Sequence, residues 1–191
     1  MLCLYQTEQQ SNKHSDLILK KLSVLIVAIT CIFTLSGCVA DYASVDDEKF
    51  AKTFKIKDPN TSQIYIYRPK HYFGSWMKKR VWVDGKFAAD LTNETFFVAI
   101  VKPGQHIVST RSEFGNNHIT FNTKPGRNYY VKQNIKYGVF APGSGIRLMS
   151  YKVAMKDILN LDLVEGFEDD EKDIDKKDFN ELKSELYSQN K

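Results

Sequence analysis

The amino-acid sequence predicts an all-β domain, an antiparallel β-sandwich of about eight strands, and three observations support this prediction. Segments such as Gln63–Arg68 (QIYIYR) alternate along the chain and are rich in β-branched and aromatic residues, as strands are. Turn signals recur at about the 8–12-residue spacing that is typical of sandwiches and barrels. No stretch between Thr61 and Asp157 shows a helical period as strong as these alternations.

The expected strands follow one another with recognisable turns between them. After Gln63–Arg68, the strands Arg80–Val83 and Lys86–Leu91 flank Asp84-Gly85, which is a strong signal for a hairpin. Thr95–Val101 (TFFVAIV) is apolar on both faces, so we expect a central strand that is covered on both sides. The later expected strands are Gln105–Arg111, His118–Asn122, Asn128–Tyr137 and Ile146–Val153.

An uncharged segment of 14 residues, 22–35, follows Lys20 and Lys21. It is too short for a spanning helix, which needs about 20 apolar residues, and it fits the apolar core of a secretory signal. The segment runs into Leu35-Ser36-Gly37-Cys38, which resembles the lipobox of bacterial lipoproteins. The resemblance implies that residues 1–37 are a signal peptide. It also implies that Cys38 carries a diacylglycerol and an N-acyl chain such as palmitate.

Alternatives stay open for this region. One is an ordinary transmembrane anchor, and another is a cleaved signal without a lipid. The long stretch before the apolar segment contains Glu8 and Asp16, which departs from the usual signal pattern. A translation start downstream of Met1 is therefore a further alternative.

The predicted signal peptide and lipid anchor also lead to expectations about the cysteine chemistry and the location of the protein. Cys3 and Cys31 lie within the removed part, so the mature chain would hold neither a free thiol nor a disulfide. Val39 stands where enteric lipoproteins retained in the inner membrane have an Asp, which implies the periplasmic face of the outer membrane. Residues 38–60 are expected to form a lipidated tether, with a first helix near Asp46–Phe54 as the alternative.

Charge separates the rest of the chain into a basic domain and an acidic tail. Residues 61–157 hold 15 Lys and Arg against 5 acids, so their net charge is +10. Residues 158–191 hold 11 acids against 5 Lys, so their net charge is −6. Phe179, Leu182 and Leu186 form one apolar stripe, which predicts a short amphipathic helix in the tail. Such a helix docks on the domain, binds a partner or stays disordered.

No set of residues has a convincing catalytic or metal-binding spacing. The chain has no glycine-rich phosphate loop and no Gly-x-Ser-x-Gly motif. His71, His106 and His118 are scattered, and no free cysteine is left for a zinc site. A catalytic triad of Ser109, His106 and Asp90 stays a possibility, because triads are recognised by their geometry and not by their order in the sequence. We expect no enzyme, no metal and no cofactor apart from the covalent lipid.

The most unusual stretch is an expected loop over 70–80, KHYFGSWMKKR, which mixes cations with aromatic side chains. Such side chains suit a membrane interface, a glycan or a protein partner. They also suit single-stranded nucleic acid, which a secreted lipoprotein rarely meets, so we expect no nucleic-acid partner. The alternative is a loop whose rings fold back on the sandwich. The residues expected to bind a partner are Lys70, Tyr72, Phe73, Trp76, Lys78, Lys79 and Arg80.

Four motifs within residues 64–153 resemble the family of bacterial lipoproteins described as domain of unknown function 2846. The motifs are IYIYR (64–68), VWVDGK (81–86), VKPGQH (101–106) and PGRNYY (125–130). The second and third are also similar to PEGA-type β-sandwich repeats of surface proteins. The resemblance implies a β-sandwich in an envelope lipoprotein, and it brings no reaction and no catalytic residue.

These observations lead to two main functional hypotheses. The first is a non-enzymatic outer-membrane lipoprotein whose periplasmic sandwich binds another envelope component, a protein. The second is a carrier or sensor of a glycan fragment or lipid, which aromatic residues such as Tyr65, Tyr67, Trp82 and Tyr130 suggest. An envelope hydrolase is kept as a third hypothesis, because a triad can be invisible in sequence.

Overall fold

The computed structural model describes residue 21 and residues 42–166, 173–174 and 176–189. The signal peptide, the lipobox and Cys38 predicted from the sequence lie outside these residues. The chain divides into two units, Met1–Val39 and Ala40–Lys191, and the elements below belong to the second. They are α2 (Val45–Ala51), β1 (Ser62–Arg68), β2 (Lys79–Val83), β3 (Lys86–Leu91), β4 (Thr95–Val101), β5 (Gly104–Ser112), β6 (Gly115–Thr123), β7 (Arg127–Lys136), β8 (Gly143–Leu148), α3 (Tyr151–Ile158), β9 (Asp162–Leu163) and α4 (Lys176–Gln189).

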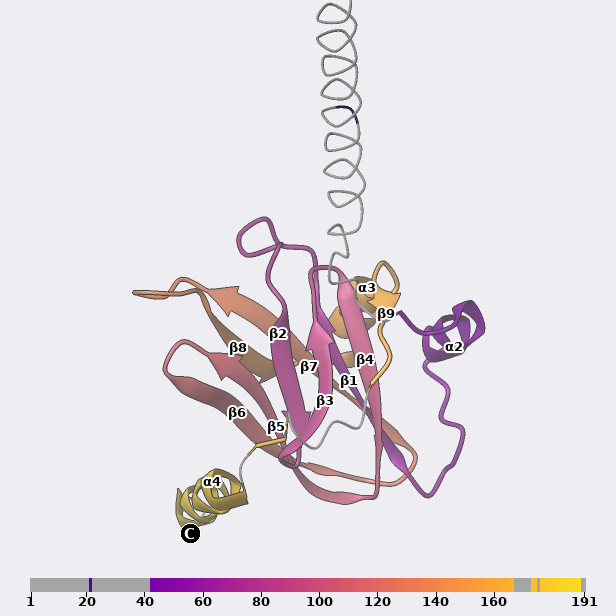
Figure 1. Cartoon of the computed structure of the whole chain (residues 1–191). Helices are drawn as coiled ribbons and strands as arrows, with labels where there is room; N and C mark the ends of the chain where they lie inside the picture. The colour runs from indigo at the N-terminus through magenta and orange to yellow at the C-terminus, as the bar shows by residue number, and fades with distance from the viewer. Residues whose placement is uncertain (1–20, 22–41, 167–172, 175, 190–191) are drawn as a thin grey trace, which may run out of the picture. The chain divides into compact units, whose positions relative to one another are not determined.

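The strands form two sheets, in the orders β8-β7-β1-β4-β9 and β3-β2-β5-β6 (Figure 1). Apolar side chains from both sheets meet in one core cluster, as in a sandwich. The predicted β-sandwich is therefore confirmed, with one difference in strand direction. The second sheet is antiparallel, but the first is mixed, because β1 runs parallel to β7 and β4 runs parallel to β9. Parallel neighbours need a long connection, and the chain makes one by building the whole second sheet between β1 and β7.

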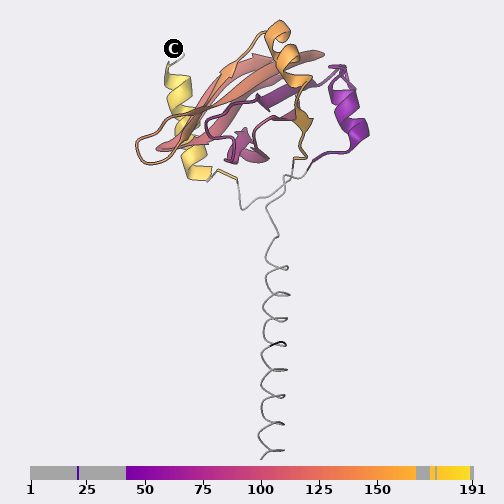
Figure 2. The same ribbon diagram turned by 90° about the horizontal axis from the view of Figure 1, so that it is seen from above.

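The strand that is buried on both faces is β1, all seven residues of which are buried. Ile64 and Ile66 point into the core between the sheets. Tyr65 and Tyr67 point the other way, into a second cluster that contains residues of α2 and α3. The two helices thus cover the outer face of the first sheet, away from α4 (Figure 2).

The expectation that Thr95–Val101 is the fully covered central strand is wrong. β4 pairs with β1 on one side, but on its other side the short β9 reaches only Thr95 and Phe96. Ile100, near the far end of β4, is 61 % exposed. An apolar run shows that a strand can be covered, but it does not show which strand has neighbours on both sides.

A second correction concerns the expected strand Ile146–Val153. The strand β8 ends at Leu148, and α3 begins at Tyr151. Ala154 and Ile158, four residues apart, form the buried face of this helix on the first sheet. The helix is two turns long, which is too short for its period to stand out in the sequence.

The folded unit also extends further in both directions than residues 61–157. In the expected tether, α2 confirms the alternative of a first helix, and the Ser44 side chain caps it by accepting from the Asp47 N–H at 3.2 Å. Beyond Asp157, the buried residues Leu161 and Leu163 complete the cluster under α2 and α3. Each segment adds only a few apolar side chains to a cluster that is built mostly by other elements. Neither segment therefore shows an apolar pattern in the sequence that would predict its burial.

We predict that truncating Ile66 destabilises the domain far more than truncating Ile100. Ile66 is completely buried between the sheets, so Ile66→Ala should reduce the free energy of unfolding by about 2–5 kcal/mol. Ile100→Ala is the matched control on the neighbouring strand, where most of the side chain is already in water, and should cost about 0.5 kcal/mol or less. Urea unfolding followed by circular dichroism gives both values. Equal losses would contradict the assignment of the core.

Candidate functional site

The loop between β1 and β2, residues 69–78, carries the exposed aromatic side chains that the sequence singled out. Tyr72 is 98 % exposed and Trp76 is 75 % exposed. Phe73 is partly buried, and its ring lies 4.0 Å from the ring of Tyr137. The expected alternative, in which the rings fold back on the sandwich, therefore describes Phe73 only.

Two of the predicted loop cations, Lys79 and Arg80, belong to strand β2 instead. The Lys79 Nζ donates to the carbonyl of Pro142 at 2.6 Å, and burial lowers the pKa of this amine. The Arg80 guanidinium lies over the rings of Trp82 and Phe87, at 5.9 and 5.7 Å. Both side chains thus make contacts within the domain. Lys70 and Lys78 are more exposed, and the Lys70 Nζ lies 3.2 Å from Glu94 Oε1.

The buried guanidinium of Arg68 holds this loop against the sandwich. Its Nη1 donates to the carbonyl of Met77 at 2.6 Å and to that of Leu91 at 3.3 Å, and its Nη2 donates to the carbonyl of Gly74 at 2.5 Å. Arg68 is only 1 % exposed, and burial lowers its pKa to about 10, so it is still charged at neutral pH. Gly74 has a φ of +73°, and a Cβ there would lie 2.8 Å from the Cγ2 of Ile135. The loop is therefore fixed at its middle and at its end.

A second exposed loop, residues 137–142 between β7 and β8, lies next to the first. Its side chains Tyr137, Val139 and Phe140 are exposed, Phe140 by 87 %. The carboxylate of Glu113, in the turn between β5 and β6, accepts the backbone N–H groups of Val139 at 2.8 Å and of Ala141 at 3.1 Å, and also that of Phe140. These three hydrogen bonds, of which the one from Phe140 has the largest effect, hold the pKa of Glu113 below its usual value.

Ring contacts join the two loops and the turn into one surface. Phe73 touches Tyr137, and Phe114, which follows Glu113, lies 6.4 Å from the ring of Phe140. We call this surface the aromatic end. It comprises Tyr72, Phe73, Trp76, Phe114, Tyr137 and Phe140. Sequence reasoning found the first three and missed the others, although the apolar YGVFAP turn at 137–142, which no strand requires, was a usable signal.

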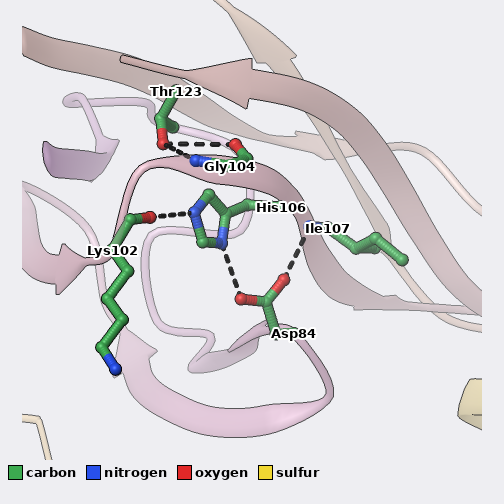
Figure 3. A network of polar contacts seen from close by, with 6 residues as sticks. All are labelled: Asp84, Lys102, Gly104, His106, Ile107 and Thr123. Carbon is green, nitrogen blue, oxygen red and sulfur yellow. Dashed lines mark hydrogen bonds and ion pairs between the residues drawn. The ribbon is translucent and has the colours of Figure 1, made fainter. Parts of the chain in front are cut away.

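Two sequence motifs meet in a polar network at the other end of the second sheet (Figure 3). The His106 Nδ1 lies 2.7 Å from Asp84 Oδ2, and its Nε2 lies 2.8 Å from the Lys102 carbonyl. Asp84 Oδ1 also accepts the N–H of Ile107 at 2.9 Å. The imidazole of His106 thus bridges the Asp84 side chain and the backbone at Lys102. The VDGK and PGQH motifs therefore form one cross-strand clamp.

Ser109, His106 and Asp90 do not form the triad that the sequence left possible. Asp84, not Asp90, is the carboxylate at His106, and Asp90 lies 3.8 Å from Arg80 instead. The Ser109 hydroxyl is buried and has no hydrogen-bond partner within the described part of the chain. Among the described residues, no three His, Cys, Asp or Glu side chains gather closely enough to hold a metal ion.

The Asp84-Gly85 hairpin also receives the acidic tail. Asp84 and Gly85 both have positive φ angles, +53° and +82°, as a two-residue hairpin turn requires. The Ile174 N–H donates to the Gly85 carbonyl at 2.9 Å, and Asp173 accepts the Phe87 N–H at 2.6 Å. The ring of Phe179 in α4 lies directly on Gly85, where a Cβ would come within 2.9 Å of it. The predicted tail helix is confirmed, and its first stripe residue docks on the domain.

A small cavity of about 220 Å³ lies between α2 and the first sheet. Phe50, Tyr65, Val98 and Leu163 give it a largely apolar wall, and Lys57 contributes a cation. Of the four aromatic residues proposed for ligand binding, only Tyr65 lines this cavity. Its hydroxyl already donates to the Ala51 carbonyl at 3.0 Å. This volume lies below the roughly 300–1,000 Å³ of typical ligand sites, whereas a wider hollow of about 640 Å³ is lined by Phe54, Tyr130 and Tyr151.

Comparisons with known proteins place the chain in a family. Residues 58–144 match the family model described as "Protein of unknown function (DUF2846)". The chain is 35 % identical over 130 residues to an uncharacterized protein of Haemophilus influenzae strain Rd. The aligned region covers 68 % of this chain and 77 % of that protein. The chain therefore belongs to the DUF2846 family, as its motifs suggested. No solved structure matches it. Within the described residues, no helix has the length and apolar character needed to cross a bilayer.

We predict that the 137–142 loop loosens in acid through Glu113. Because the pKa of this carboxyl is depressed in the folded state, its stabilising effect is complete above the ordinary glutamate pKa and is lost as the pH falls below that value. Hydrogen-exchange protection factors for the amides of Val139 and Ala141 should fall over this range. In Glu113→Gln they should be low at every pH. An unchanged pH profile in the variant would contradict this role.

We also predict that the Asp84 clamp is worth more than a surface ion pair. Asp84→Asn keeps the size of the side chain and tolerates positive φ, but it removes the charge that bonds His106, so it should cost about 1–3 kcal/mol of unfolding free energy. Asp90→Asn is the matched control, because its pair with Arg80 is long and partly exposed, and it should cost about 0–1 kcal/mol. Urea unfolding at neutral pH compares them. A larger loss for the control would overturn the assignment.

Proposed function

We propose that the protein is a non-enzymatic lipoprotein of the bacterial cell envelope, held by a lipid on Cys38 at the periplasmic face of the outer membrane. Its sandwich binds another component of the envelope through the aromatic end. The observation that carries this proposal is the set of largely exposed rings, all of the aromatic end except Phe73, on loops that the domain holds in place. Ring side chains exposed in this number cost solubility, and contiguous apolar patches of this kind mark interaction sites.

The lipid anchor is supported by the sequence around Cys38. The lipobox residues Leu35, Ser36 and Gly37 precede it, and the apolar segment before them has the length of a signal. A diacylglycerol with an added N-acyl chain gives stable attachment, since two or more chains are needed for it. The envelope component that binds the aromatic end is either a protein or the lipid layer itself, and both fit exposed rings flanked by cations.

A second candidate function is the carriage of a small ligand. The cavity under α2 supports it, because its apolar wall and the Lys57 amine suit a small amphipathic anion. The cavity is small, and the aromatic end is a larger and more exposed feature, so the binding role is the first proposal.

We predict that both the anchor and the aromatic end are needed for contact with the envelope. Cross-linking in intact cells, followed by purification and mass spectrometry, should capture specific neighbours of the full-length protein. Cys38→Ala should release the protein from the membrane fraction and abolish those cross-links. Tyr72→Ser combined with Trp76→Ser should leave the protein in the membrane fraction but reduce the cross-links several-fold. Both side chains are exposed, so these changes leave the fold intact.

The control is Ile100→Ser, which removes an exposed apolar side chain outside the aromatic end. It should change neither fractionation nor cross-linking. If the double variant retains every neighbour, the aromatic end does not bind a protein. If Cys38→Ala stays in the membrane fraction, the lipid anchor is wrong.

A further inference from the structure

Tyr42, where the described part of the domain begins, lies nearer to the aromatic end of the first sheet than to its opposite end. Tyr42 forms an antiparallel bridge with Val164, which directly follows β9. β9 pairs with Thr95 at the start of β4, and Thr95 pairs with Arg68, the last residue of β1. Tyr42 therefore lies on the β9 edge of the sheet, about level with Phe97, the third of the seven residues of β4, and so nearer to the end where β1 passes into the loop 69–78 than to the opposite end.

The other parts of the aromatic end follow from the same strand directions. Because β7 runs parallel to β1, its last residue Lys136 and the loop 137–142 lie where β1 finishes. β2 leaves the loop 69–78, and the antiparallel β5 therefore returns to the same end at Ser112, just before Phe114. The contact between the rings of Phe73 and Tyr137 is a direct measure of this proximity.

The distance along the chain from Cys38 to this end is short. Tyr42 follows Cys38 by four positions, and four residues span at most about 14 Å when fully extended. A lipid on Cys38 sits in the bilayer, so Tyr42 stays within that reach of the headgroup layer. The half of the sandwich that holds Tyr42, which is the half nearer to the aromatic end, is thereby kept close to the membrane surface.

The side chains at this end have the chemistry of a membrane interface. Tryptophan and tyrosine are the residues that gather at the headgroup level of membrane proteins, with one edge apolar and one edge polar. The exposed cations Lys70, Lys78, Arg111 and Lys136 flank them, and anionic headgroups attract such cations. The acid on the same loops, Glu113, is engaged by three backbone N–H groups.

We propose that the aromatic end rests in the phospholipid headgroup layer of the same membrane that holds the Cys38 lipid. This inference rests on the proposed function and deepens it, because it names the envelope component as lipid. Rings that project from three separate loops fit a soft, adaptable surface, whereas a protein partner needs one matched face of about 800 Å². The lipid anchor supplies the affinity, and the aromatic end fixes the orientation of the sandwich, since a tethered site is occupied even when its own affinity is weak.

The two tryptophans allow a direct test, because Trp76 is exposed in the aromatic end and Trp82 is buried. The lipidated full-length product is reconstituted in vesicles of phosphatidylethanolamine and phosphatidylglycerol, with and without phospholipid brominated near the headgroup. Bromine should remove most of the Trp76 emission, and the membrane should shield this residue from acrylamide in the water. Trp76→Phe should abolish the bromine effect and leave the emission of Trp82.

A matched control places a tryptophan at the opposite end of the sheet. Trp76→Phe combined with Ile100→Trp puts the probe at an exposed position of β4 that pairs with Gln63, far from the start of that strand. Brominated lipid should not quench it, and acrylamide should. Quenching of both positions to the same extent would show random tumbling on the anchor and would overturn the inference.

The remaining outcomes separate this inference from the proposed function. If the protein does not float with the vesicles, the anchor itself is absent and the proposed function fails with it. If it floats but Trp76 stays open to acrylamide and unquenched by bromine, the anchor stands and the orientation is wrong. If Trp76 becomes shielded only when other envelope proteins are added, the component at the aromatic end is a protein, which overturns the lipid assignment.

Discussion

The buried guanidinium of Arg68 is the interaction on which the exposed end of the molecule depends. It stands at the last position of a fully buried strand and has no carboxylate partner among the described ion pairs. A lone buried charge is costly, and here three backbone carbonyls, of Gly74, Met77 and Leu91, compensate it. The arrangement works in both directions, because the guanidinium in turn supplies hydrogen bonds to carbonyls of the loop and of the end of β3. One side chain thus closes the core and fixes a ten-residue loop.

The neighbouring loop is also held by a charged side chain that bonds its backbone. Glu113 accepts three consecutive backbone N–H groups of the 138–141 segment, as Arg68 donates to carbonyls of the 74–77 segment. In each case a charged side chain from a strand end or turn satisfies backbone groups that a loop would otherwise present to water. The aromatic rings can then project outward without being needed for the stability of their loops. That separation is what lets an exposed apolar surface stay rigid.

Much of the fold could be predicted from local signals, and the failures have physical causes. The Asp84-Gly85 hairpin and the alternating strand at residues 62–68 depend on neighbouring residues only, and both were predicted correctly. The central position of β1 could not be predicted, because it depends on β4 and β7, which follow much later in the chain. Only part of the aromatic end could be predicted from the sequence. Trp76 lies in a conspicuous basic segment, whereas Phe114 and Phe140 are single residues in separate turns that only the tertiary structure brings together.

The parallel pairing of β1 with β7 has a consequence for how the chain acquires its structure. A chain that emerges amino-terminus first exposes β1 before either of its neighbours has been made. The segment QIYIYR, with its β-branched and aromatic side chains, must then stay without its β4 neighbour until residue 101 has been made, and without its β7 neighbour until residue 132. Such a segment is prone to intermolecular strand pairing. During folding of this domain, completion of its sheets therefore competes with self-association of its first strand.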